Sequence, residues 1–131
     1  MPDQSTLTRE LLAVNQRLLE SIAAGDWETY ASLCDASISA FEPESLGHLV
    51  EGLEFHRFYF NLGAAPGPRT TSMTSPHVRV MGDVAVVSYV RLVQRLDADG
   101  QPVVARCEET RVWQRMEGRW RHVHFHRSAA R

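Results

Sequence analysis

Four long strand-like runs in the second half of the sequence place the tightest constraint on the fold. They are rich in Val and Arg and lie at 70–82, 84–97, 102–116 and 119–128. The pieces that separate them, MGD, DADG and MEGR, combine Gly with charged residues, as hairpin turns do. We therefore predict an antiparallel meander of four strands. Each run has ten or more residues, and strands that exceed the usual length of about five or six residues twist and bend.

The N-terminal part of the chain has the spacing of helices instead. In segment 8–25 apolar residues recur at helical intervals, and Gly25 ends the pattern with a residue suited to a helix C-terminus. Asp26 follows as an N-cap for a second helix over 27–34, because its carboxylate can accept from the first free amides. We therefore predict two consecutive helices at the N-terminus.

The middle of the chain connects these helices to the strands. Residues 38–43 form a short extended piece that Pro43 ends. Helical spacing returns over 49–62, and the Gly- and Pro-rich segment 63–68 is a loop. Three helices followed by a long antiparallel meander predict a single α+β domain over 1–131. A bent sheet wrapped around helices leaves a cone-shaped hollow, which is a place for a pocket.

Composition excludes several classes of protein. The net charge of −2 does not favour a general nucleic-acid binder. No run of about 18 apolar residues predicts a membrane span, and no signal peptide is visible, so we expect a cytoplasmic protein. Cys34 and Cys107 lack metal-site spacing and are expected to be reduced core residues. All 14 basic residues are Arg, whose planar guanidinium suits carboxylates.

Strand alternation places three arginines on faces that carry apolar or aromatic side chains. Arg91 shares a face with Ala85, Val87 and Tyr89, Arg111 with Trp113, and Arg127 with Val123 and Phe125. A β-bulge within a strand would reverse the face assigned to the residues that follow it. Two interpretations follow: the arginines form one anion-binding pocket, or they are scaffold residues paired with acidic neighbours such as Glu109.

The same alternation separates other charged residues. His122, His124 and His126 lie opposite Val123 and Phe125, so we expect them to face water or a neighbouring subunit, not a metal. Glu108 and Glu109 are neighbours on a strand, point to opposite faces and cannot share one catalytic site.

Three long segments resemble a known family. CDASISAFEPESLGHLVEGLEFHRFYF, PHVRVMGDVAVVSYVRLVQRLDADGQP and EETRVWQRMEGRWRHVHFHRS are similar to the association (hub) domain of calcium/calmodulin-dependent protein kinase II, within the nuclear transport factor 2-like and SnoaL-like superfamily. The resemblance runs from about Leu7 to Ser128. It implies an α+β cone in which a curved antiparallel sheet encloses helices, and self-assembly into a homodimer or a larger homo-oligomer.

The resemblance also implies a binding site. The hub has a deep pocket lined by arginines that accepts small carboxylates, and the matching residues here are Arg91, Arg111 and Arg127, with His56 at the pocket edge. His56 is otherwise explained as a packed helix residue. The segment NLGAAPG departs from the family, which carries a bulky loop with a tryptophan near the pocket mouth. We expect neither a cofactor nor a metal.

Two function classes remain open. The first is a free-standing oligomerisation module that binds a small carboxylate such as acetate, citrate or a hydroxy acid. No kinase glycine loop with its lysine and no basic calmodulin-target helix occurs in the sequence, so kinase activity and direct calmodulin binding are not expected. The second is a SnoaL-like isomerase, cyclase or dehydratase that would use His56 as its acid or base.

Overall fold

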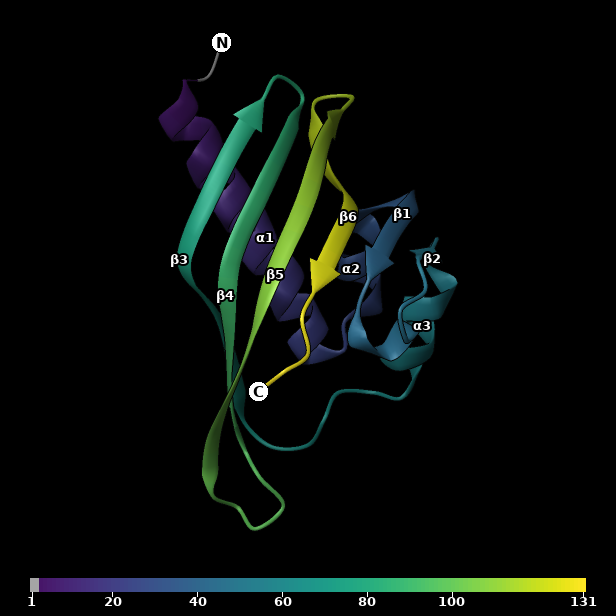
Figure 1. Cartoon of the computed structure of the whole chain (residues 1–131), viewed down its shortest axis with the longest axis vertical. Coiled ribbons are helices and arrows are strands. Elements are labelled where there is room, and N and C mark those ends of the chain that lie inside the picture. Colours follow the sequence, from purple (N-terminus) through teal and green to yellow (C-terminus); the bar gives the residue numbers. More distant parts are fainter. Residues whose placement is uncertain (1–2) are drawn as a thin grey trace.

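The computed structural model describes residues 3–131 and has helices packed on one side of a six-stranded sheet (Figure 1). The helical elements are α1 (Gln4–Ala24), α2 (Trp27–Leu33), the short 3-10 helix η1 (Pro43–Ser45) and α3 (Glu54–Asn61). The strands are β1 (Cys34–Phe41), β2 (Val50–Glu51), β3 (Arg69–Met81), β4 (Val84–Leu96), β5 (Pro102–Met116) and β6 (Arg119–Arg127). The predicted α+β class is confirmed.

The sheet has the strand order β2-β1-β6-β5-β4-β3. Strands β3 to β6 form the predicted antiparallel meander, with hairpin turns at the three expected places. The sequence did not reveal that β1 joins the sheet parallel to β6, or that β2 pairs with β1 at the edge. The β4–β5 hairpin projects beyond the rest of the molecule at the lower end of Figure 1.

Helix α1 closes the core against the inner face of β3 and β4. Its apolar side chains Leu11, Leu18 and Leu19 are fully buried. The side-chain amide of Asn15 on the same helix is buried as well, and its Oδ1 accepts a hydrogen bond from Trp113 Nε1 at 3.0 Å. This bond satisfies an indole N–H that would otherwise be costly to bury.

The junction between α1 and α2 follows the predicted signals. Gly25 is the C-cap of α1 at φ 67°, where a side chain is disfavoured. Asp26 caps α2 by accepting from the Thr29 backbone amide at 3.2 Å. A Cβ on Gly25 would lie 3.0 Å from the Ala64 nitrogen, so the loop after α3 packs directly against this turn.

The predicted helix over 49–62 is wrong at its N-terminal end. Val50–Glu51 is strand β2, and the helix begins only at Glu54. Gly52 between them has φ 83° and donates its amide to Ile38 O at 2.7 Å, which fixes the chain beside β1. Pairing with a strand distant in sequence therefore overrides the local helical spacing.

A β-bulge in β6 corrects the prediction for its histidines. Val112 pairs with His124 and Trp113 pairs with His122, so Val123 has no residue opposite it on β5. The extra residue reverses the alternation, as bulges do. His122 is therefore fully buried on the same side as Phe125, whereas it was expected on the opposite face.

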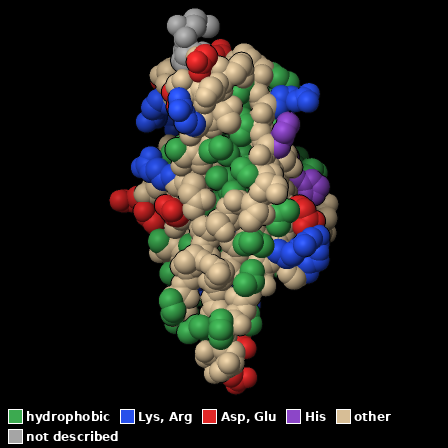
Figure 2. All heavy atoms as spheres, turned by 90° about the vertical axis from the view of Figure 1, so that its left-hand side faces the viewer, with side chains coloured by type: hydrophobic (Ala, Val, Ile, Leu, Met, Phe, Trp, Pro, Cys, Tyr) green, Lys and Arg blue, Asp and Glu red, His purple; other side chains and the backbone are tan. Residues whose placement is uncertain are grey.

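Three further features bear on function: the cysteines, the length of the helices and the exposed hydrophobic side chains. Cys34 and Cys107 are buried and free, as predicted. In the described part of the chain, no helix has the length and apolar character needed to cross a membrane. Exposed hydrophobic side chains include Leu96 and Val104 near the end of the β4–β5 hairpin, and hydrophobic side chains gather at this end in Figure 2.

Candidate functional site

A cavity of about 130 Å³ lies between the inner face of the sheet and the α2, η1 and α3 segments. All four residues proposed from the sequence, Arg91, Arg111, Arg127 and His56, line it. It is smaller than the roughly 300–1,000 Å³ of drug-sized ligand pockets, so it suits a small molecule. Aromatic side chains, among them Tyr30 and Phe125, form part of its wall.

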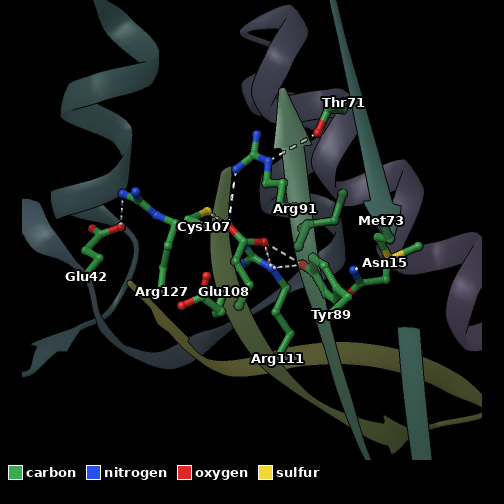
Figure 3. A network of polar contacts seen from close by, with 12 residues as sticks. Asn15, Glu42, Thr71, Met73, Tyr89, Arg91, Cys107, Glu108, Arg111 and Arg127 are labelled. Carbon is green, nitrogen blue, oxygen red and sulfur yellow. Dashed lines mark hydrogen bonds and ion pairs between the residues drawn. The ribbon is translucent and has the colours of Figure 1, made fainter. Parts of the chain in front are cut away.

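Arg111 is the most buried of the three arginines, with 1% of its surface exposed. Its Nη2 lies 3.1 Å from Glu109 Oε1, and Glu109 is itself only 2% exposed. Arg111 and Glu109 lie on β5, and Figure 3 shows Arg111 beside Tyr89, which lies on β4. Tyr89 Oη accepts from Arg111 Nε at 2.9 Å and donates to Glu109 Oε1 at 2.5 Å. Both buried charges therefore have hydrogen-bond partners, as buried charges require.

The electrostatics of Glu109 follow from this arrangement. Burial alone would raise the pKa of its carboxyl, but the Arg111 and Arg91 guanidiniums and the Tyr89 hydroxyl lower that pKa to about 2. Glu109 is consequently ionised at every ordinary pH. It neutralises one of the two arginine charges beside it and leaves the other without a buried counter-charge of its own.

Arg111 also contacts the residues that the β6 bulge brings inward. Its guanidinium carbon lies 4.5 Å from the centre of the Phe125 ring, and its Nη1 lies 3.4 Å from His122 Nε2. Burial and then the Arg111 charge lower the pKa of His122 well below its usual value. His122 is therefore a neutral imidazole behind the cavity wall, next to the Cys34 thiol at 3.4 Å.

Arg91 and Arg127 approach the cavity from opposite sides. Arg91 donates its Nε to Thr71 Oγ1 at 3.1 Å and its Nη1 to Glu109 Oε2 at 3.2 Å. Arg127 donates its Nη2 to both carboxylate oxygens of Glu44, at 2.6 and 2.7 Å. Within residues 3–131, Arg91 Nη2 and the Nε and Nη1 of Arg127 make no hydrogen bond or ion pair.

His56 reaches the cavity from α3 and is 5% exposed. Its Nδ1 lies 3.5 Å from Glu42 Oε1, while its Nε2 is buried and has no hydrogen-bond partner in the described part of the chain. Burial, followed by the Arg111 charge, lowers the pKa of His56 to about 4. A neutral imidazole with an unsatisfied nitrogen therefore borders the cavity, and such buried polar atoms are uncommon without a ligand or a water.

Two carboxylates at the cavity were missed by the sequence analysis. Glu42 is buried at the end of β1, and Glu44 stands on η1. Burial and the Glu44 charge raise the pKa of the Glu42 carboxyl, while Arg127 opposes this shift. Alternation of the buried residues Ile38 and Ala40 places Glu42 on the inner face, so β-periodicity would have identified it once 38–43 was taken as part of the sheet.

The cavity as a whole is close to electroneutral. Three guanidiniums face three carboxylates, those of Glu42, Glu44 and Glu109, and the histidine is uncharged. Among residues 3–131, no cluster of three or more His, Cys, Asp or Glu side chains could hold a metal ion. The arrangement can offer guanidinium donors and one imidazole nitrogen to a small polar molecule.

A curved sheet that encloses helices and a cavity defines the nuclear transport factor 2-like class of fold. A solved nuclear transport factor 2-like superfamily protein from Salmonella enterica has this fold, with a TM-score of 0.77, 24% identity, and 97% and 93% of the two chains covered. More specifically, the chain belongs to the calcium/calmodulin dependent protein kinase II association domain family, whose model matches residues 7–131.

Individual relatives agree with this assignment. The delta subunit of calcium/calmodulin-dependent protein kinase type II from Oryctolagus cuniculus is 46% identical over 131 residues, which cover 98% of this chain and 25% of the relative. The association domain from C. elegans superimposes with a TM-score of 0.91 at 45% identity, covering 96% and 98% of the two chains. The hub homology domain from Chlamydomonas reinhardtii gives 0.89 at 52% identity, covering 95% and 99%. The chain thus spans about a quarter of the length of the kinase subunit that it matches.

Proposed function

We propose that this association domain is a self-associating module whose inner cavity binds a small carboxylate. The observation that carries the proposal is the position of three guanidinium groups around one cavity, together with His56 Nε2, which has no hydrogen-bond partner among residues 3–131. Planar guanidinium groups bind carboxylates through paired, charge-assisted hydrogen bonds. The side chains of Arg111 and Arg91 are 1% and 12% exposed, and burial strengthens such bonds relative to the same bonds in solvent.

The contacts within the protein support different roles for the arginines. Arg111 is held by Glu109 and Tyr89, so it serves mainly as a fixed positive charge in the cavity wall. Arg91 and Arg127 keep N–H groups without partners in the described chain, so each can still donate to a ligand carboxylate. His56 Nε2 would complete the site, either by donating to the acid or by accepting from a second polar group of the ligand.

Calorimetric titration with acetate at constant ionic strength tests this proposal, with acetamide as the uncharged analogue. We expect acetate to bind the protein and acetamide to fail, because only the carboxylate gains charge-assisted bonds. Replacing Arg127→Gln should weaken acetate binding about tenfold to a hundredfold, the equivalent of a lost charge-assisted hydrogen bond.

Arg131→Gln is the matched control, because Arg131 pairs with Glu108 on the surface and does not line the cavity. Equal acetate affinity in Arg127→Gln and Arg131→Gln would contradict the proposal. Arg111 is a poorer choice for mutation, because its removal leaves Glu109 buried without its main counter-charge and endangers folding.

Acid–base catalysis by His56 is the alternative, and its structural support is the Glu42 carboxylate 3.5 Å from Nδ1. The lowered pKa of His56, about 4, makes it a weak base at neutral pH, where a catalytic pKa near 7 is most effective. The binding module therefore has the stronger support. The enzyme would be favoured instead if the wild-type protein catalyses exchange of a proton between a bound acid and solvent and His56→Gln does not.

A further inference from the structure

The carboxylate of Glu44 already accepts hydrogen bonds from Arg127, whose side chain is 18% exposed. Arg127 Nη2 donates to both of its oxygens, at 2.6 and 2.7 Å, and also lies 3.5 Å from Glu42 Oε2. Both paired donor edges of a guanidinium, Nε with Nη2 and Nη1 with Nη2, include Nη2, so a ligand carboxylate that binds Arg127 through paired hydrogen bonds must take this nitrogen from Glu44. Two carboxylates that share one guanidinium repel each other, so they compete for it.

Glu44 is the most exposed of the three carboxylates at the cavity, so its side chain can move away from Arg127 most easily. Its side chain is 37% exposed, whereas those of Glu42 and Glu109 are 8% and 0% exposed. It stands on η1, a turn of three residues that ends at Leu46 with φ 52° and continues into Gly47 with φ 87°. A non-glycine residue at positive φ is unfavourable, so this turn is not in its most relaxed backbone conformation.

The charge balance adds a second constraint on the ligand. With three carboxylates already facing three guanidiniums, the displacement of Glu44 into water frees room for one negative charge. A second ligand charge would then exceed the number of guanidiniums at the cavity, and a partly buried charge without a counter-charge is costly.

Building on the proposed function, we propose that Glu44 is an internal competitor that a ligand must displace from Arg127, and that it restricts the cavity to monocarboxylates. Glu44 is thus a specificity-determining residue of the carboxylate site. Its exchange with the ligand carboxylate opens the η1 turn.

Calorimetry with two acids of equal size tests the restriction. Malonate carries two carboxylates and malonamate carries one carboxylate and one amide, so the pair separates charge from size. We expect the wild-type protein to bind malonamate at least about tenfold more tightly than malonate. In Glu44→Gln, malonamate should bind about threefold to tenfold more tightly than in wild type, and malonate should gain more than malonamate does.

Glu108→Gln is the control for this experiment, because it also removes a carboxylate paired with an arginine but lies outside the cavity. It should leave both affinities unchanged. Equal malonamate affinity in Glu44→Gln and wild type, or equal binding of malonate and malonamate by wild type, would overturn the role of Glu44. Loss of binding in Arg127→Gln would show in that case that the carboxylate site itself stands. Failure of every variant and wild type to bind either acid would instead overturn the proposed function, and this inference with it.

Hydrogen exchange provides a readout that does not depend on a mutation. The amides of Leu46 and His48 donate to Pro43 O and Ser45 O, at 3.2 and 3.0 Å, only while η1 is closed. Saturation with malonamate should accelerate exchange at these two amides, although ligands usually slow exchange near their site. Slower or unchanged exchange at both amides would contradict the displacement of Glu44.

Discussion

The cluster of Arg111, Glu109 and Tyr89 shows how single residues set the properties of the cavity wall. A buried ion pair contributes little net stability, because desolvation of both charges offsets their attraction. Apolar side chains of similar volume would often serve a core equally well or better. The position of the pair beside a cavity therefore supports a role in fixing charge and orientation there.

Two buried histidines make the free energy of unfolding depend on pH. The pKa of His56 is lowered to about 4, and that of His122 is also lowered, because both rings are buried near Arg111. Below the unfolded-state pKa of about 6.5, the unfolded chain binds protons that the folded chain excludes, so acid favours unfolding. We expect the free energy of unfolding to fall from pH 7 to pH 5.5, with a slope that approaches about 1.4 kcal/mol per pH unit for each histidine.

Urea unfolding of wild type and His56→Gln at several pH values measures this effect. The variant should have a shallower pH profile, since one of the histidines with a lowered pKa is absent. His48→Gln is the control, because His48 is exposed, and its profile should follow that of wild type. Parallel profiles for all three proteins would show that His56 is protonated equally in the folded and unfolded states.

Contacts between elements determine which turn glycines can be replaced by a residue with a side chain. Gly25 ends α1 and touches the loop that follows α3, whereas Gly82 turns the β3–β4 hairpin, where an added Cβ would meet nothing within 4 Å. Both have positive φ, at 67° and 63°. They therefore share the backbone requirement for glycine and differ in packing.

This difference predicts the outcome of a matched pair of substitutions. Gly82→Ala should cost about 1 kcal/mol for the left-handed backbone alone. Gly25→Ala should cost about 1 kcal/mol more, because its new Cβ would lie 3.0 Å from the Ala64 nitrogen and force the loop to shift. Chemical denaturation gives both values, and an equal loss in the two variants would mean that the loop yields without strain.

At the scale of the whole molecule, no helix among residues 3–131 covers one face of the sheet. The helices lie behind the sheet in Figure 1, and the opposite face of β4, β5 and β6 presents half-buried side chains to solvent. Val86, Val112 and His124 lie side by side on it, because Val112 pairs with both of the others. Apolar surface of this kind favours association between copies of a chain, most simply about a two-fold axis.

Multi-angle light scattering at micromolar concentration tests the association. We expect at least a dimer for wild type, and dissociation in Val112→Glu, because a charge at the centre of the interface would be buried without a partner. Leu62→Glu is the control, since Leu62 is exposed at the end of α3 and lies off this face. A wild-type monomer, or an undisturbed oligomer in Val112→Glu, would contradict an interface on the open sheet face.

Local signals in the sequence were enough to predict most of the secondary elements. Alternation and turn residues predicted the meander from β3 to β6, and Gly25 and Asp26 marked the junction of two helices. The same alternation, joined to a family resemblance, selected Arg91, Arg111 and Arg127, which do line one cavity with His56. The elements depend on neighbours a few residues away, so periodicity and propensity suffice to predict them.

Features that depend on pairing between distant segments became visible only in the folded chain. The bulge at Val123 is defined only against β5, and it turns His122 inward. The pairing of Val50–Glu51 with β1 replaces a predicted helical turn, because hydrogen bonds across the sheet outweigh weak local preference. The meeting of Glu44 with Arg127, 83 positions apart, sets the charge of the cavity, and no local pattern encodes a contact at that separation.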